Sequence, residues 1–201
     1  MKFMNETSLL EVIRKRRTSY QFLDSDSYPV EDTELKICLE SAIWAPNHKL
    51  TQPWRFWVLG SDMQKRVAEV YAQKRAQKQS QNDPDLYQSA YDKALEKFIR
   101  IPKIVLVGQL LAKDPVIAKE DYAACACAIQ NFQLSAWYQQ IGVQWSTGPI
   151  LNDPRTYEML GIEAENCELI GVLYLGKIDE DCCPNQMVKR KPVAEVTVFT
   201  D

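Results

Sequence analysis

The stretch Ala45-Pro46-Asn47-His48-Lys49-Leu50-Thr51-Gln52-Pro53-Trp54-Arg55-Phe56 lies between a predicted helix and a predicted strand, and it is rich in hydrogen-bonding side chains. The helix is indicated by apolar residues spaced along one face: Leu35, Cys38, Leu39 and Ala42. Pro46 then ends it, because proline cannot continue a helix. Residues 54 to 59 are aromatic and β-branched and stop at Gly60, which predicts a buried strand. Donors and acceptors therefore converge over residues 47 to 53, where the backbone is not committed to a ladder.

This connection contains the only histidine of the chain, His48, together with a lysine, a threonine and a glutamine. One interpretation is an ordinary polar connection in which His48 caps the preceding helix, and composition alone favours it. The other interpretation is a ligand-binding loop. These residues by themselves leave both open.

Two motifs together resemble the FMN-dependent nitroreductase family. The first is Ala-Pro-x-x-x-x-x-Gln-Pro-Trp-x-Phe over residues 45 to 56. The second is Arg16-Arg17-Thr18, about thirty residues upstream at the end of the first predicted helix. Ala-Pro-Asn-His-Lys further resembles a subgroup of similar length with a histidine in this loop. The pair at this separation is more specific than either motif alone, and the resemblance extends from about Val12 to Phe199.

The resemblance implies an α+β fold, in one domain over residues 1–201, with a central, mostly antiparallel sheet flanked by helices. It also implies a homodimer in which the C-terminal strand is exchanged with the partner and two flavin sites lie at the interface. The implied activity uses bound FMN and NADH or NADPH. Hydride passes through flavin N5 in a ping-pong cycle to a nitroaromatic, quinone or related acceptor, and no protein residue is catalytic.

The same resemblance assigns flavin contacts to the Arg-x-Thr triplet, the 47–53 connection, a glycine-flanked segment and the tail. The residues implied to bind FMN are Arg16, Arg17, Thr18, His48, Gln52, Trp145, Ser146, Thr147 and Arg190. The chemistry is consistent, because a dianionic phosphate needs charge-assisted donors such as guanidinium groups. The cation near flavin N1 stays open between His48, Lys49 and Arg17.

Simpler interpretations accompany these assignments. Arg14 and Lys15 crowd the last turn of a helix predicted from about Ser8 to Arg17, where cations complement the helix dipole, and we keep that interpretation for them. Residues 143 to 148 also suit a short strand and turn. One departure concerns Leu50, where many family members have an asparagine that bonds the flavin pyrimidine. It leaves flavin affinity and redox potential open.

The rest of the chain predicts alternating elements. Ser61-x-x-Gln64 resembles a capping box that opens a helix. The insertion over 77–100 either shapes the substrate mouth or merely covers the sheet. A continuous apolar run within 103–111 predicts a central strand, and a small-residue helix over about 116–140, ended by Gly142 in the C′ position, suits the fold centre or a dimer axis. Further strands are expected over 169–176 and 196–199, with a short helix between Asn152 and Gly161 before the first of them.

Composition excludes several classes of protein. A chain of 201 residues suits one domain that buries about 70 per cent of its unfolded surface. A net charge of −3 gives no reason to expect nucleic-acid or membrane partners, and no apolar run is long enough to span a membrane. Residues 1 to 10 do not resemble a signal peptide. The six cysteines lack metal-site spacing, so we expect reduced thiols, no metal and a cytoplasmic protein.

Two other functions compete with the oxidoreductase. A flavin-binding or flavin-handling protein on the same fold, with little reductase turnover, would keep its flavin oxidised when NAD(P)H is added without oxygen. A helical interaction domain with an incidental Gln-Pro-Trp loop would be colourless and would ignore added FMN. The sequence does not reveal the acceptor, the preferred nicotinamide or the pathway.

Overall fold

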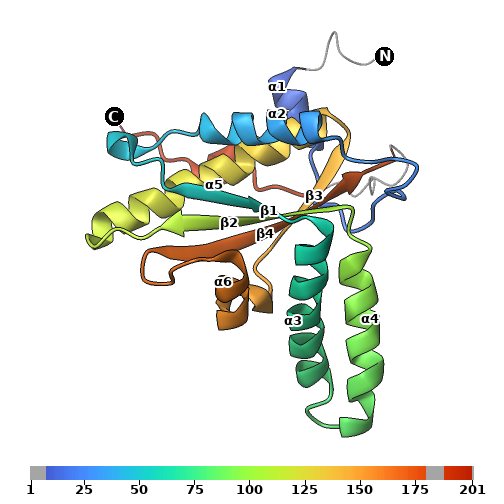
Figure 1. Ribbon diagram of the computed structural model, residues 1–201. Coiled ribbons are helices and arrows are strands. Elements are labelled where there is room, and N and C mark those ends of the chain that lie inside the picture. Colours follow the sequence, from blue (N-terminus) through green and yellow to red (C-terminus); the bar gives the residue numbers. More distant parts are fainter. Residues whose placement is uncertain (1–7, 180–187, 201) are drawn as a thin grey trace.

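The sheet has four antiparallel strands in the order β1-β2-β4-β3. The computed structural model describes residues 8–179 and 188–200 (Figure 1). The strands are β1 Trp54–Val58, β2 Lys103–Leu110, β3 Ile141–Ser146 and β4 Cys167–Lys177. The helices are α1 Leu9–Lys15, α2 Asp32–Ile43, α3 Ser61–Gln79, α4 Tyr87–Ile99, α5 Pro115–Tyr138, α6 Pro154–Leu160 and α7 Val193–Val196, with 3-10 turns η1 His48–Leu50, η2 Pro84–Leu86 and η3 Pro149–Asn152. The expected α+β fold with an antiparallel sheet is confirmed.

Helices cover both faces of the sheet and bury two separate cores. Figure 1 shows α2 and α5 on one face and α3, α4 and α6 on the other. Strand β2 contributes to both cores because successive side chains point to opposite faces. Val105 and Val107 pack under α2 and α5, whereas Ile104 and Leu106 pack under α3 and α4. Strand β2 is therefore buried on both sides, as its continuous apolar run predicted.

The expected capping box of α3 is wrong. Gly60 occupies the N-cap position, and no side chain caps the helix there. The Gln64 side chain instead turns inward, where Nε2 donates hydrogen bonds to the carbonyl oxygens of Phe98, Ile99 and Ile101 at 3.2, 3.2 and 2.8 Å. These carbonyls lie at the end of α4 and just beyond it, where helix acceptors lack a full set of intrahelical donors. Gln64 therefore ties α3 to α4.

The predicted role of Gly142 is also wrong. Helix α5 ends at Tyr138, and Gln140 adopts the left-handed conformation with φ 59°. Gly142 lies inside β3, where a Cβ atom would collide with the side chains of Ser19 and Ile178. The glycine is thus required by close packing of neighbouring segments, a constraint that local sequence does not reveal.

The segment after α1 runs beside β3. Ser8 caps α1 in a capping box with Glu11, as its place at the start of the predicted helix suggests. Thr18 forms a parallel bridge with Val143, and the Ser19 amide donates to the Val143 carbonyl oxygen at 3.2 Å. Residues 16 to 18 are therefore fixed against the edge of the sheet.

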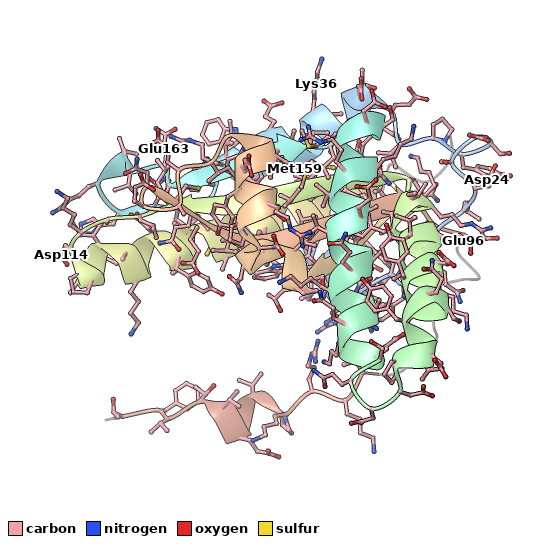
Figure 2. The ribbon with its side chains drawn as sticks, turned by 60° about the horizontal axis from the view of Figure 1, so that its bottom comes forward. Asp24, Lys36, Glu96, Asp114, Met159 and Glu163 are labelled. Atoms are coloured by element: carbon pink, nitrogen blue, oxygen red, sulfur yellow. The ribbon has the colours of Figure 1, made fainter. Side chains whose placement is uncertain are left out.

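Two parts of the chain extend beyond the sheet. Helices α3 and α4 form a long hairpin that projects from the body (Figure 1). The tail over residues 188–200 is exposed throughout, and Figure 2 shows α7 separated from the rest of the molecule. The strand expected over 196–199 has no pairing partner within the part of this chain that the structure describes. Its exchange with a second subunit stays a prediction.

Helix α5 buries only one face in a single chain, and apolar residues such as Tyr122, Ala123 and Cys127 are exposed on the other. Cys125 is buried and Cys127 is exposed, as their spacing predicted. Cys38, Cys125, Cys127 and Cys167 are free thiols, and Cys182 and Cys183 lie outside the described residues. Over residues 8–179 and 188–200, no group of three or more potential ligands could hold a metal ion. No helix in the same ranges has the length and apolarity to cross a membrane.

Candidate functional site

Arg16 and Arg17 lie near Arg190, which comes from the far end of the chain, beside β3. Arg16 follows α1, and its pKa is lowered by burial first, and then by the positive charges of Arg17 and Arg190. The two motifs that the sequence singled out at residues 16–18 and 190 are therefore neighbours in space. We call Arg16, Arg17 and Arg190 the Arg16 cluster. Thr18, with its bridge to Val143, places a hydroxyl-bearing residue directly next to it.

The Arg16 cluster is not neutralised by the described part of the chain. No carboxylate forms an ion pair with any of its three members within those residues. Nη1 of Arg17 donates to the carbonyl oxygens of Arg14 and Arg16 at 2.6 and 2.9 Å, which orients it without cancelling its charge. Adjacent guanidinium groups repel one another, so an anion between them would be strongly favoured.

A cavity of about 560 Å³ opens on the α3 and α4 face of the sheet. Part of its lining, Tyr20 to Phe22, follows Thr18 closely along the chain. The cavity is lined by Tyr20, Gln21, Phe22, Tyr71, Lys97, Phe98, Arg100, Ile101, Gln144, Ser146 and Tyr174. Ser146 forms a side-chain hydrogen bond with Tyr174, and burial raises the pKa of that phenol, which keeps it protonated. The lining is aromatic, contains two cations and holds no carboxylate. It suits a flat ligand that carries negative charge.

The predicted residues of β3 divide between the two faces. Ser146 lines the cavity, whereas the Trp145 indole packs against Gly171 beside the core under α2 and α5. The indole Nε1 atom is buried without a hydrogen-bond partner among the described residues. Thr147 is exposed just beyond the end of the strand. Only Ser146 of the three therefore presents its side chain to the cavity.

Lys97 and Arg100 are cavity residues that the sequence did not single out. Both come from the end of α4, within the insertion expected near the substrate mouth. Arg100 pairs with Glu96 at 2.6 Å, whereas Lys97 forms no ion pair within the described ranges. A single sequence offers no signal for Lys97, because α4 also carries Lys93 and only tertiary packing distinguishes the two.

The connection over residues 47–53, here called the 47–53 loop, is held by helix α5. Nδ1 of His48 lies 2.7 Å from Oε2 of Glu120, so the ring faces α5 instead of capping α2. Oγ1 of Thr51 donates to Oδ1 of Asp121 at 2.6 Å. The Gln52 amide donates to Oδ1 of Asn47 at 3.0 Å, which closes the loop on itself. The ordinary helix-capping interpretation of His48 is therefore wrong.

The 47–53 loop and the Arg16 cluster lie at opposite edges of the sheet. The loop leads into β1, whereas residues 16 to 18 flank β3, and β2 and β4 separate these two strands. Trp54 pairs with Gln109 of β2, which pairs in turn with Glu168 near the start of β4, whereas β3 pairs with the second half of β4. The fold of one chain does not bring His48 and Gln52 to the cluster.

Comparison with known proteins identifies the family of this chain. The model described as "Nitroreductase family" matches residues 13–177. The chain therefore belongs to the nitroreductase family.

Individual relatives agree with this assignment. "Putative NAD(P)H nitroreductase YfhC" of Bacillus subtilis (strain 168) is 30% identical over 188 residues, which cover 93% of this chain and 91% of that protein. A solved structure of a nitroreductase-like family protein from Bacillus cereus has a TM-score of 0.79 and 26% identity, and the match covers 99% of each chain. A solved "putative nitroreductase in complex with FMN" from Desulfovibrio desulfuricans shares the fold, with a TM-score of 0.68 and 23% identity over 98% of this chain and 99% of that one.

Proposed function

We propose that this chain is an FMN-dependent oxidoreductase that takes electrons from NADH or NADPH and reduces nitroaromatic, quinone or related acceptors. As a member of the nitroreductase family it is an oxidoreductase, and the name of its relative YfhC supports NAD(P)H as the donor. The FMN in the Desulfovibrio structure supports the flavin. We also propose that it works as a homodimer with two flavin sites, each lined by both chains.

The Arg16 cluster is the observation that carries the proposal. Three guanidinium groups without a counter-ion among the described residues fit a phosphate, because each can donate parallel charge-assisted hydrogen bonds to its oxygens. The half-buried position of Arg16 strengthens such bonds, since fewer waters compete there. Thr18 adds a hydroxyl for the phosphate or the ribityl chain.

The aromatic cavity beside β3 fits the ring system of the same cofactor. FMN bound there would supply the hydride-transfer chemistry, through its N5 atom, that links the nicotinamide to the acceptor in the proposed ping-pong cycle. The chain's own residues bind and orient: Ser146 offers a hydroxyl, and rings such as Tyr71 and Phe98 exclude water. No acid, base or nucleophile is needed from the protein.

Lys97 is the cation that best fits the electron-rich side of the flavin ring from within one chain. It lines the cavity and is unpaired within the described residues. The candidates from the sequence are less suitable there. Arg17 is oriented by carbonyl oxygens of its own segment, and His48 is paired with Glu120 at the far edge of the sheet. A positive charge at the ring would stabilise the reduced, anionic flavin.

A second copy of the chain would complete the site. Apolar side chains are unusually exposed on the α1, α2 and 47–53 loop surfaces, among them Leu9, Leu10, Ile13, Ile37, Ile43, Trp44 and Leu50. Trp44 is 79% exposed and Leu50 is 76% exposed, values that indicate an interface. A twofold pairing could bring the 47–53 loop of one subunit to the Arg16 cluster of the other, which one chain alone does not do.

An absorbance spectrum tests the proposal directly. Purified protein reconstituted with FMN should show the absorbance of bound, oxidised flavin. Anaerobic NADH or NADPH should bleach this absorbance fast enough to account for steady-state turnover. Adding a quinone or nitroaromatic should restore the band. Bound flavin that stays oxidised with both nucleotides would favour the flavin-handling alternative, and protein that ignores FMN would refute the flavin site itself.

A further inference from the structure

The 47–53 loop adopts a conformation that costs free energy. Lys49, Leu50 and Gln52 have φ angles of 52°, 54° and 45°, in the left-handed region that disfavours residues with a Cβ atom. Three such residues within four positions persist only where surrounding contacts over-determine the backbone. Neither the family assignment nor the proposed function explains what supplies those contacts.

Two adjacent carboxylates of α5 hold this loop, but they do so unequally. The side chains of the His48 and Glu120 pair are 57% and 40% exposed, so water competes for the contact. Asp121 is only 4% exposed and accepts the 2.6 Å hydrogen bond of Thr51. A buried carboxylate that lost its donor would stay desolvated and unsatisfied, so this contact resists opening.

The geometry points to Asp121 as a positioning residue for the cofactor. Acting through Thr51, it holds the 47–53 loop in the left-handed conformation in which the exposed Gln52 would reach the flavin of a second copy, while His48 stays paired with Glu120. This inference rests on the proposed function. Helix α5 suits the role because the residues next to Asp121 on its inner face, Ala124 and Cys125, are buried in the core and give the carboxylate a rigid base.

Thr51→Val tests the inference without removing the buried charge that folding has accommodated. Thr51→Ser keeps the hydroxyl and serves as the conservative rescue, and Glu120→Gln weakens only the exposed contact. In flavin-free Thr51→Val, amide exchange over residues 47–53 should approach the rate of an open segment, at least about tenfold faster than in the original protein, while exchange in β2 stays unchanged. With the loop open in about nine molecules of ten, the FMN dissociation constant should rise about tenfold, since it scales inversely with the fraction of protein in the competent conformation. Thr51→Ser should stay within about twofold of the original protein in both measurements, and Glu120→Gln should lie between the two variants.

Two results would overturn the inference. Unchanged loop exchange in Thr51→Val would show that the hydrogen bond does not hold the loop. Exchange at the rate of an open segment with unchanged FMN affinity would show that the loop conformation does not serve the cofactor. Failure of the proposed function looks different, because the original protein itself would then bind no FMN while the exchange measurement still decides whether Asp121 fixes the loop.

Discussion

The Arg16 cluster and the 47–53 loop are satisfied in opposite ways. In the cluster, three cations lie close together, Arg16 is partly desolvated, and no carboxylate among the described residues pairs with them. In the loop, His48 and Thr51 are bonded to α5 and Asn47 is bonded to the Gln52 backbone, but the backbone is strained at three positions. The cluster therefore holds unneutralised charge, whereas the loop holds backbone strain supported by hydrogen bonds.

The difference indicates which half of the proposed site supplies affinity and which supplies shape. An unneutralised cluster gains free energy only when an anion arrives, so binding is where its charge is used. A strained loop that hydrogen bonds hold in place has its geometry fixed before binding, at a cost in folding free energy, as is usual for preorganised binding elements. The proposed dimer joins the two, and each prediction below separates them.

Mixed dimers should give the largest effect. Arg16→Glu and His48→Glu homodimers should each bind little FMN. The Arg16→Glu carboxylate would repel the phosphate, and the His48→Glu carboxylate would repel Glu120 and disturb the loop beside the flavin ring. In a mixed dimer that pairs one chain of each kind, one site receives both defects and the other receives none. Flavin occupancy should therefore recover to about half of the sites. Differently tagged chains allow the mixed dimer to be isolated, and no recovery would place the whole site within one chain.

Arg16→Ala should weaken FMN binding by roughly 1.5–3 kcal/mol, the typical contribution of a hydrogen bond to a charged group. Arg14→Ala is the matched control, since it removes an exposed guanidinium from the last turn of α1, two residues before Arg16. Titration of flavin-free protein by fluorescence quenching measures both. Equal dissociation constants for the two variants would mean that the Arg-x-Thr motif has been assigned wrongly.

Local sequence patterns predicted most secondary-structure elements but not the tertiary contacts between them. The helix before Pro46, the strand after Pro53 and the helix closed by Gly161 were predictable because periodicity, proline and left-handed glycine act over a few residues. The errors at Gln64 and Gly142 have a shared cause, because each residue serves a partner distant in sequence that overrides its local preference.

The candidate site was foreseeable to a similar extent. Residues 16–18, 146 and 190 came from the family resemblance, and the structure brings the first and last of these segments together. Lys97 and Asp121 were not foreseeable from one sequence, because a lysine on a polar helix face and an aspartate in an apolar helix acquire their roles only through what tertiary folding places opposite them.

Removing residues 196 to 201 should weaken the dimer and the flavin site together. Val196, Val198 and Phe199 are 66%, 87% and 88% exposed in one chain, and burying such side chains contributes roughly 1.5–3 kcal/mol each. We expect the dimer dissociation constant to rise at least about tenfold and flavin occupancy to fall with it. Removing only residues 200 and 201 is the control. Light scattering of the intact protein should give about twice the chain mass of 23.1 kDa, and a flavin-loaded monomer would contradict the interface.

Lys97→Gln should change redox behaviour more than affinity. A cation at the ring stabilises the reduced flavin preferentially, so its loss should lower the two-electron midpoint potential by roughly 20 mV, about 1 kcal/mol. Lys93→Gln, one turn earlier on an exposed part of α4, should leave the potential unchanged. Potentiometric titration under anaerobic conditions distinguishes them. A potential that is the same in both variants would assign the cation to the partner's loop instead.

Arg190→Ala should give the smallest effect. It should also show which members of the Arg16 cluster contact the phosphate directly and which act only through long-range attraction. Arg190 is exposed and stands between Lys189 and Lys191, so water screens its charge and its neighbours replace part of it. We expect the FMN dissociation constant to rise less than about fivefold at low salt, and the difference to vanish near 0.5 M salt, where charges beyond a few ångströms are screened. The loss in Arg16→Ala should survive the same salt, because Arg16 is half-buried and would bond the phosphate directly. Equal salt sensitivity of the two variants would mean that the cluster acts only as a diffuse positive field, and that Arg16 makes no direct contact with the cofactor.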